Sequence, residues 1–269
     1  MTMTHREPDS PLLVRCDQQV LTIELASGQP GHPLTVAMTE HLADALEDAA
    51  RRTDIHCVVL QSQGRHFCSG GNVKDMRDGA DLMQGGVADV RDRLRRSLHR
   101  LPRALQAIEV PTIAAVQGAA VGAGCDLALM CDIRIASVDA SFAESFLRLG
   151  LVSGIGGAWF LTRIVGLSKA LEMSFTSEFL GAEAAERCGI VSEVVARDAL
   201  HARAAEMAAR IAANPPTAMR MAKKLVRESA ASSLPTALEM AASMQAILLC
   251  GDEHKQRVRQ FLDADAAHR

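Results

Sequence analysis

The sequence contains no tyrosine and one tryptophan, and aromatic residues make up only 3% of its 269 residues. Hydrophobic residues nevertheless make up 48% of the chain, so the predicted core is aliphatic and large enough for one domain with a smaller appendage. A strong excess of either charge is also lacking, because the formal net charge is −3. Neither nucleic acid nor an anionic membrane is therefore expected as a partner.

Paired cysteine motifs, an apolar leader and a long apolar run are absent too. The seven cysteines are odd in number, irregularly spaced and without a CxxC pair, which predicts free thiols in a reducing compartment and no structural zinc or other metal site. Residues 1–11 are polar, so we expect no secretory signal. The longest uncharged run, 110–125, is interrupted by Pro111 and three glycines and is too short to span a membrane. We therefore expect a cytoplasmic protein with no membrane partner.

Three common catalytic or nucleotide-binding motifs are missing. The sequence has no GxSxG elbow, so Ser69 beside His66 does not indicate a nucleophile. No GxxxxGK[ST] phosphate loop is present, and a GxGxxG reading that begins at Gly122 fails because its third glycine position is Leu127. Serine hydrolases of the elbow type, P-loop proteins and dinucleotide-binding domains are not indicated.

The hydrophobic pattern predicts an α/β core followed by a helical tail. Strands are expected at 20–26, 57–61, 112–116 and 132–136, helices at 36–51, 82–108 (broken near Pro102) and 126–130, and a polar loop at 64–81. After about residue 195 the strand patterns end, and helices are expected at 198–213, 217–228, 234–250 and 252–262. We place the boundary at residue 196, between a core of residues 1–196 and a tail of residues 197–269. The tail is too short to bury much surface alone, so it is expected to pack on the core or on another subunit.

Two glycine-rich turns each follow a predicted strand. The first contains Gly70 and Gly71, within residues 64–72, and the second spans residues 118–126 and opens a helix. Backbone N–H groups at such turns and at helix N-termini can stabilise an oxyanion. Taken singly, each turn is equally consistent with a tight turn or with close packing of small residues.

Taken together, the two turns and their surroundings resemble the crotonase (enoyl-CoA hydratase/isomerase) family. The segments that carry the resemblance are FCSGGN at 67–72, VPTIAAVQG at 110–118, GAGCDLA at 122–128 and CDIRIA at 131–136. The resemblance runs from about residue 12 to the C-terminus. It implies an α/β spiral of ββα units, with a C-terminal helical region that builds homotrimers, in some members paired into hexamers as a dimer of trimers.

The resemblance also implies a substrate and an oxyanion hole. Family members act on acyl-CoA thioesters, so coenzyme A would enter as part of the substrate and no cofactor would be bound permanently. By position, the backbone N–H groups of Gly71 and Ala123 would bind the thioester oxygen. Arg65 and Lys74 match basic positions near the CoA nucleotide, although both are also consistent with solvated surface charges.

The sequence departs from the family pattern at the acid–base positions. Hydratases of the family use two catalytic glutamates. The position of the first glutamate is occupied here by Asp126, and that of the second by Phe146. Phe146 cannot transfer a proton, and its ring would narrow the acyl pocket if it faces inward. Some isomerases and hydrolases place an acid at the position of Gly154. If residues 144–146 are extended, the side chains of Glu144 and Phe146 point to the same face of the strand. The two side chains are then roughly 6–7 Å apart along the strand, so Glu144 could reach the site. Asp126 is alternatively a helix-dipole partner, and Glu144 a surface or structural carboxylate.

Several functions are consistent with this pattern. The first expectation is hydration of an enoyl-CoA with Asp126 and Glu144 as the catalytic carboxyl groups. Double-bond isomerisation and thioester hydrolysis share the same oxyanion and are the alternatives. A non-catalytic acyl-CoA-binding homologue is favoured by Phe146 and Gly154, and a purely structural trimer would leave both glycine turns unexplained.

Overall fold

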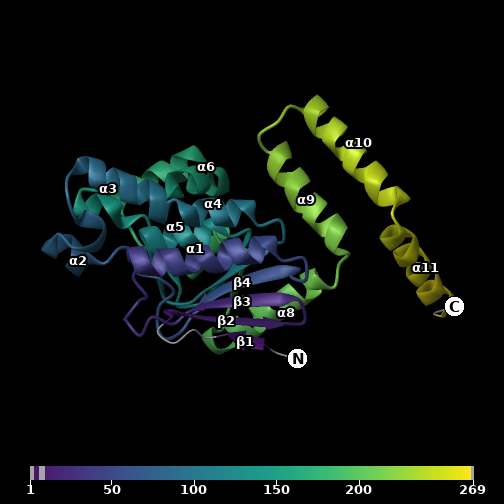
Figure 1. The fold of residues 1–269 in the computed structure, drawn as a ribbon, viewed down its shortest axis with the longest axis horizontal. Coiled ribbons are helices and arrows are strands. Elements are labelled where there is room, and N and C mark those ends of the chain that lie inside the picture. Colours follow the sequence, from purple (N-terminus) through teal and green to yellow (C-terminus); the bar gives the residue numbers. More distant parts are fainter. Residues whose placement is uncertain (1–2, 6–9, 268–269) are drawn as a thin grey trace. The chain divides into compact units, whose positions relative to one another are not determined.

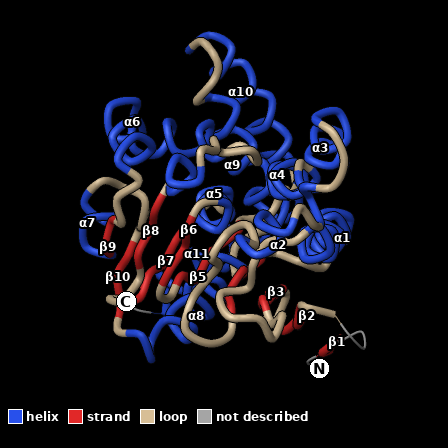
Figure 2. Tube along the Cα trace, turned by 90° about the vertical axis from the view of Figure 1, so that its left-hand side faces the viewer, coloured by secondary structure: helices blue, strands red, loops and turns tan. Residues whose placement is uncertain are grey.

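The computed structural model describes residues 3–5 and 10–267 and divides into two compact units, residues 1–211 and 212–269. Residues 1–2 and 6–9, part of the segment from which we expect no secretory signal, lie outside the described residues. Within the described part, the first unit contains one seven-stranded and one three-stranded sheet (Figure 2). The large sheet has the order β1 (Met3–His5), β2 (Leu12–Asp17), β3 (Val20–Leu25), β4 (Cys57–Ser62), β5 (Thr112–Val116), β7 (Ile133–Ser137) and β10 (Glu193–Val195), and the small sheet has the order β6 (Ala119–Val121), β8 (Ser141–Ala143) and β9 (Leu180–Gly181).

Helices follow most of the strands. Their bounds are α1 Val36–Arg51, α2 Val73–Asp78, α3 Val87–Arg93, α4 Arg100–Ala107, α5 Ala123–Met130, α6 Gly157–Thr176, α7 Ala182–Arg187, α8 Leu200–Ala212, α9 Pro216–Ser229, α10 Leu234–Cys250 and α11 Asp252–Ala267. Short turns of helix lie at Asp81–Met83, Leu94–Leu98, Ser145–Leu149 and Arg197–Ala199. Helix α1 has the predicted bounds, because Met38, Leu42 and Leu46 face the core and Thr35 Oγ1 caps the Met38 N–H.

Two predicted segments differ from the structure. The expected loop 64–81 contains helix α2, which Asn72 caps through its side-chain oxygen. The expected helix 82–108 is divided into α3, a π-helical turn and α4. Pro102 does not break a helix there, since it lies in the first turn of α4, where proline is tolerated.

The two faces of the large sheet are covered by different helices. Figure 1 shows α1 and α4 on one face of the sheet and α8 on the other. Leu200, Ala204 and Ala208 of α8 are buried against Val59 and Ile113 of the sheet. The first unit therefore includes α8 up to its last residue and ends between residues 211 and 212, and the boundary expected at residue 196 falls too early.

The strands bend and continue into the small sheet. Strands β5 and β7 pair in parallel, and their continuations β6 and β8 also pair in parallel, with Ala119 opposite Ser141. Beyond the end of β4, Cys68 forms a parallel bridge with Ala120. Between β5 and β6, Gly118 has φ +55°, and a Cβ there would overlap the Arg65 carbonyl oxygen. This repeated strand–bend–strand–helix arrangement is the ββα spiral that the resemblance implies.

The second unit consists of α9, α10 and α11. Helices α9 and α10 contact each other, and apolar side chains of both line a groove of about 490 Å³. Among the described residues no single helix is long and apolar enough to cross a membrane, although α10 and α11, bent by 68°, pass that test together on length and composition.

Candidate active site

The two glycine turns lie in direct contact. Backbone hydrogen bonds join Cys68 N–H to the Ala119 carbonyl (3.1 Å) and Val121 N–H to the Cys68 carbonyl (3.0 Å). A Cβ on Gly70, which has φ +81°, would lie 2.5 Å from the Val121 oxygen and 3.1 Å from the Ala123 nitrogen. Glycine is therefore required at residue 70, and the fold places the first turn against the N-terminus of α5.

The N–H groups of Gly71 and Ala123 are available for a ligand. Both residues are half-buried, and among the described residues neither amide donates a hydrogen bond to a protein acceptor. Ala123 begins α5, where the helix leaves such N–H groups unpaired. The structure thus brings together the two turns from which the oxyanion hole is predicted.

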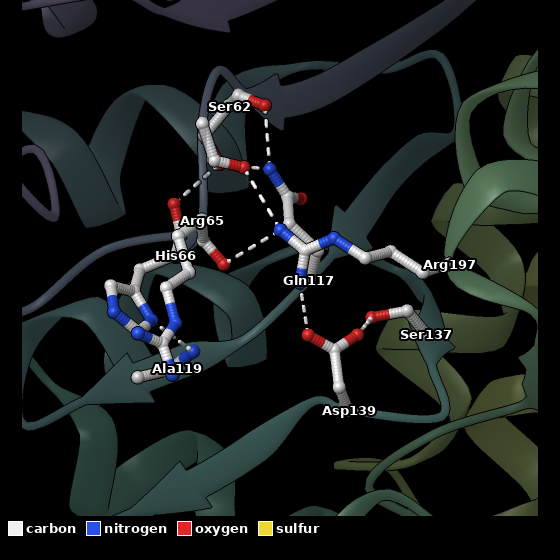
Figure 3. A network of polar contacts seen from close by, with 9 residues as sticks. Ser62, Arg65, His66, Gln117, Ala119, Ser137, Asp139 and Arg197 are labelled. Atoms are coloured by element: carbon white, nitrogen blue, oxygen red, sulfur yellow. Dashed lines mark hydrogen bonds and ion pairs between the residues drawn. The ribbon is translucent and has the colours of Figure 1, made fainter.

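A polar network holds the loop that leads into the first turn (Figure 3). Gln117 Nε2 donates to the carbonyl oxygen (2.6 Å) and the hydroxyl (2.9 Å) of Ser62, and Ser62 Oγ donates to the His66 carbonyl (3.0 Å). The Ala119 N–H donates to His66 Nδ1 at 3.1 Å. These bonds tie the end of β4 to the bend between β5 and β6, so each turn supports the other.

Arg197 extends this network from a distant part of the sequence. Its guanidinium donates to the carbonyl oxygens of Gly64 and Arg65, both at 3.1 Å, and pairs with Asp139 (Figure 3). The side chains of Arg65 and Lys74 are exposed, and neither forms an ion pair with a described residue. Both cations are thus free to contact a ligand, and their role towards CoA stays a prediction.

Asp126 is fully buried on α5, one turn after Ala123. Its Oδ2 accepts a hydrogen bond from Ser153 Oγ (2.8 Å), which in turn accepts one from the Gly157 N–H (2.9 Å). A Cβ on Gly157 would overlap Asp126 Oδ1, so the carboxyl group lies against the N-terminus of α6. Asp126 Oδ1 itself has no hydrogen-bond partner among the described residues.

Glu144 lies beside Asp126, although not for the reason that the sequence suggested. Residues 144–146 are not extended: Glu144 has φ −86° and ψ 65° and precedes the helical turn Ser145–Leu149. The condition for a common face of Glu144 and Phe146 is therefore not met, and the spacing of roughly 6–7 Å does not apply. Glu144 is only 3% exposed, which excludes the surface alternative, and its carboxyl group interacts directly with that of Asp126. Glu144 Oε1 lacks a partner among the described residues.

The surroundings of the two carboxyl groups raise both pKa values. Burial, followed by the charge of Glu144, raises the pKa of Asp126 well above its usual range, and the Ser153 hydrogen bond opposes this rise. Burial also raises the pKa of Glu144. The adjacent thiol of Cys125 has its pKa raised well above normal by burial and by both carboxylates. Displaced pKa values of this kind occur often at catalytic sites.

The two remaining family positions hold no acid. The ring of Phe146 is half-buried and lies beside Gly122, where a Cβ would be 3.7 Å from it, so Phe146 lies next to the second turn. At Gly154, a Cβ would meet Leu94 at 3.6 Å, and the carbonyl accepts a hydrogen bond from His99 Nε2. No group of three metal-binding side chains occurs among the described residues.

Sequence reasoning missed Ser153, Gly157 and Cys125. A serine in a glycine-rich loop ahead of a helix has no distinctive pattern, and its contact with Asp126 depends on how α5 and α6 pack. Gly157 could have been noticed as a residue whose missing side chain leaves room for another group.

Known proteins share both this sequence and this fold. Residues 15–268 match the family described as enoyl-CoA hydratase/isomerase. The chain is 32% identical to 2,3-dehydroadipyl-CoA hydratase of Escherichia coli, over 94% of this chain and 96% of that one. It is 30% identical to 1,2-epoxyphenylacetyl-CoA isomerase of the same organism, over 93% of this chain and 95% of that one. The crystal structure of enoyl-CoA hydratase from Mycobacterium smegmatis superposes with a TM-score of 0.87 at 32% identity, over 96% of this chain and 97% of that one. The chain belongs to the enoyl-CoA hydratase/isomerase (crotonase) family and is an acyl-CoA enzyme of that family.

Proposed function

We propose that this enzyme adds water to the double bond of a 2-enoyl-CoA, with Asp126 and Glu144 as its catalytic carboxyl groups. The observation that carries the proposal is the buried carboxyl pair one helical turn beyond the free Ala123 N–H. Hydration needs one group that takes a proton from water and one that gives a proton to the α-carbon. Two adjacent carboxyl groups, one ionised and one protonated, meet that need.

The backbone N–H groups of Gly71 and Ala123 would bind the thioester oxygen. When water attacks the β-carbon, negative charge develops on that oxygen, and the two N–H groups stabilise it. Losing one oxyanion donor typically costs about 10²–10³-fold in rate. Arg65 and Lys74 would contact the CoA portion of the substrate, and Phe146 would bound the acyl pocket beside Gly122.

The working form of the enzyme is part of the same proposal. We propose a homotrimer, or a dimer of trimers, in which the second unit carries the subunit contacts, and a cytoplasmic location. No permanently bound cofactor is proposed. The described cysteines are all free thiols, which supports a reducing compartment.

Isomerisation is the second candidate reaction. It needs one proton to leave a carbon and one to return at another, which an adjacent acid and carboxylate can also supply. One matched relative is named an isomerase, which supports this alternative. Thioester hydrolysis, or binding without turnover, would follow if the carboxyl pair had no access to the substrate carbons.

The first experiment mixes the purified protein with crotonyl-CoA and follows the loss of the enoyl-thioester absorbance. Asp126→Asn is the matched variant, because it keeps the shape of the side chain and removes its proton chemistry. We expect turnover by the wild type and at least a 10²-fold loss in the variant, on the order of one general acid–base contribution. Equal rates in both proteins would contradict the assignment of Asp126, and no turnover at saturation would shift the reaction to isomerisation, hydrolysis or binding alone.

A further inference from the structure

The carboxyl groups of Asp126 and Glu144 leave two oxygens without a donor. Both groups are buried and interact directly, yet Asp126 Oδ1 and Glu144 Oε1 have no hydrogen-bond partner among the described residues. With both groups ionised, two interacting carboxylates would each keep a buried oxygen without a donor, which is strongly unfavourable. A single proton between the two oxygens would satisfy both of them.

Ser153 determines which oxygen of Asp126 is free to hold that proton. Ser153 Oγ accepts the Gly157 N–H at 2.9 Å, so its own hydrogen is directed at Asp126 Oδ2, 2.8 Å away. Oδ2 is thereby occupied as an acceptor. A proton on Asp126 consequently resides on Oδ1, which is the unpaired oxygen.

We propose that Asp126 and Glu144 share one proton as a carboxylic acid–carboxylate pair, and that Ser153 is the positioning residue that directs this proton to Oδ1 of Asp126. In the resting site Asp126 is the acid and Glu144 the carboxylate. This inference rests on the hydration proposed above, and adds the protonation state in which the enzyme works and the residue that sets it.

The pair returns to its starting state after each turnover. Glu144 takes a proton from water as the water oxygen bonds to the β-carbon, and the electron pair of the C=C bond moves onto the thioester as an enolate. Asp126 gives its proton to the α-carbon as the enolate collapses. Glu144 is then protonated and Asp126 ionised, and the proton crosses the shared hydrogen bond from Glu144 to Asp126. Water is thus added in full, with no other acid or base.

The neighbouring groups are consistent with a single negative charge. From α5 the thiol of Cys125 faces Glu144 and stays protonated, because burial raises its pKa. The N-terminus of α6 contributes the Gly157 N–H and no titratable side chain. No lysine, arginine or histidine of the described residues forms an ion pair with Asp126 or Glu144, so nothing nearby would neutralise a second charge.

Infrared spectroscopy of the ligand-free protein tests the shared proton without any turnover. At neutral pH we expect a carbonyl band of a protonated carboxylic acid that disappears in Asp126→Asn. In Glu144→Gln the burial of Asp126 remains and the charge of Glu144 is lost, so the band should be lost at a lower pH than in the wild type. A wild type without the band, or a band that survives in Asp126→Asn, would overturn the proposal.

The role of Ser153 is tested by the pH profile of kcat/KM. Ser153→Ala removes a hydrogen bond that lowers the pKa of Asp126, so the basic limb should move to higher pH. Ser153→Thr keeps the hydroxyl group and should restore the wild-type limb. A uniform loss of activity with an unmoved limb in Ser153→Ala would show a merely structural role.

The two proposals fail in distinguishable ways. If the protein shows the infrared band but does not hydrate crotonyl-CoA, the proposed reaction is rejected and the shared proton is retained. If the protein hydrates crotonyl-CoA without the band, only the shared proton is rejected.

Discussion

Asp126 and Glu144 keep their carboxyl groups in a place where ionisation is costly. Their usual pKa values, 3.8 and 4.5, are both raised in the folded protein, chiefly by burial. A residue with a raised folded pKa binds its proton more tightly when folded than when unfolded. Its contribution to stability is therefore complete below the unfolded pKa and is lost as pH rises through the folded pKa.

This linkage predicts the pH dependence of stability at the pair. We expect the free energy of unfolding of the wild type, relative to Asp126→Asn, to fall as pH rises above 3.8, because the variant has no proton to lose at this position. Urea unfolding of both proteins across a pH series measures this difference, in which the other titrating groups largely cancel. A difference that grows in favour of the wild type with pH would contradict the raised pKa.

At single residues, sequence reasoning reached furthest where a motif specified the position. The roles of Gly71, Ala123 and Asp126 follow from the resemblance of the two turns to the crotonase family, and the structure places those turns in contact. The roles themselves stay predictions. The environment of Glu144 could not be predicted, because it depends on a helical turn that the expected extended segment does not contain.

At the scale of elements, the bend at Gly118 is the feature that directs β5 into the small sheet. We expect Gly118→Ala to lower the free energy of unfolding by more than the ~1–2 kcal/mol that a left-handed alanine costs, because its Cβ would also overlap the Arg65 carbonyl. The matched control is Gly79→Ala, which is left-handed (φ +63°, ψ 27°) and where no atom lies within 4 Å of the added Cβ. Urea unfolding measures the free energy of unfolding of both variants. An equal loss in both would show that the overlap with the Arg65 carbonyl is not the cause.

Helices with locally defined ends were predicted well, and elements defined by tertiary packing were not. Helices α1 and α10 have the predicted bounds, since the residues that cap them, Thr35 and Ser233, are local properties of the chain. Strands β6, β8 and β9 have two or three residues each, too few for a periodic pattern, and they form only because β5 and β7 bend side by side. The π-helical turn at Leu94–Leu98 likewise has no sequence signal that we could use.

At the scale of the whole molecule, the second unit exposes more apolar surface than an isolated helical unit would keep in water. Leu238 and Ile247 of α10 are 60% and 59% exposed. The groove between α9 and α10 is lined by Ala218, Met221, Ala222, Leu225, Leu238, Ala241, Ala242, Met244, Gln245 and Leu248. Apolar surfaces of this kind commonly mark subunit contacts.

We therefore expect Leu238→Lys to lower the molar mass measured by light scattering from that of a trimer or hexamer towards that of a monomer. A charge at this position would have to be buried without a partner if the groove closed against another subunit. Glu239→Gln, an exposed neighbour on the same helix, is the control and should leave the molar mass unchanged. A wild-type monomer would contradict the proposed assembly.

The domain boundary shows the limit of sequence reasoning at this scale. Helix α8 resembles its successors in composition, and its apolar positions at Leu200, Ala204 and Ala208 do not reveal which surface they cover. Only the packing on Val59 and Ile113 assigns it to the first unit. The sequence predicted that the C-terminal region is helical, but it did not predict the residue at which the second unit begins.

The contact of Arg197 with the carbonyl of Gly64 also has a consequence during synthesis of the chain. The two residues are 133 positions apart, an interval that a ribosome translates in on the order of ten seconds. From residue 126 to residue 196 both glycine turns have been made, while the side chain that holds the loop ahead of the first turn has not. A chain released within that stretch would carry the complete oxyanion sequence without the arginine that anchors it.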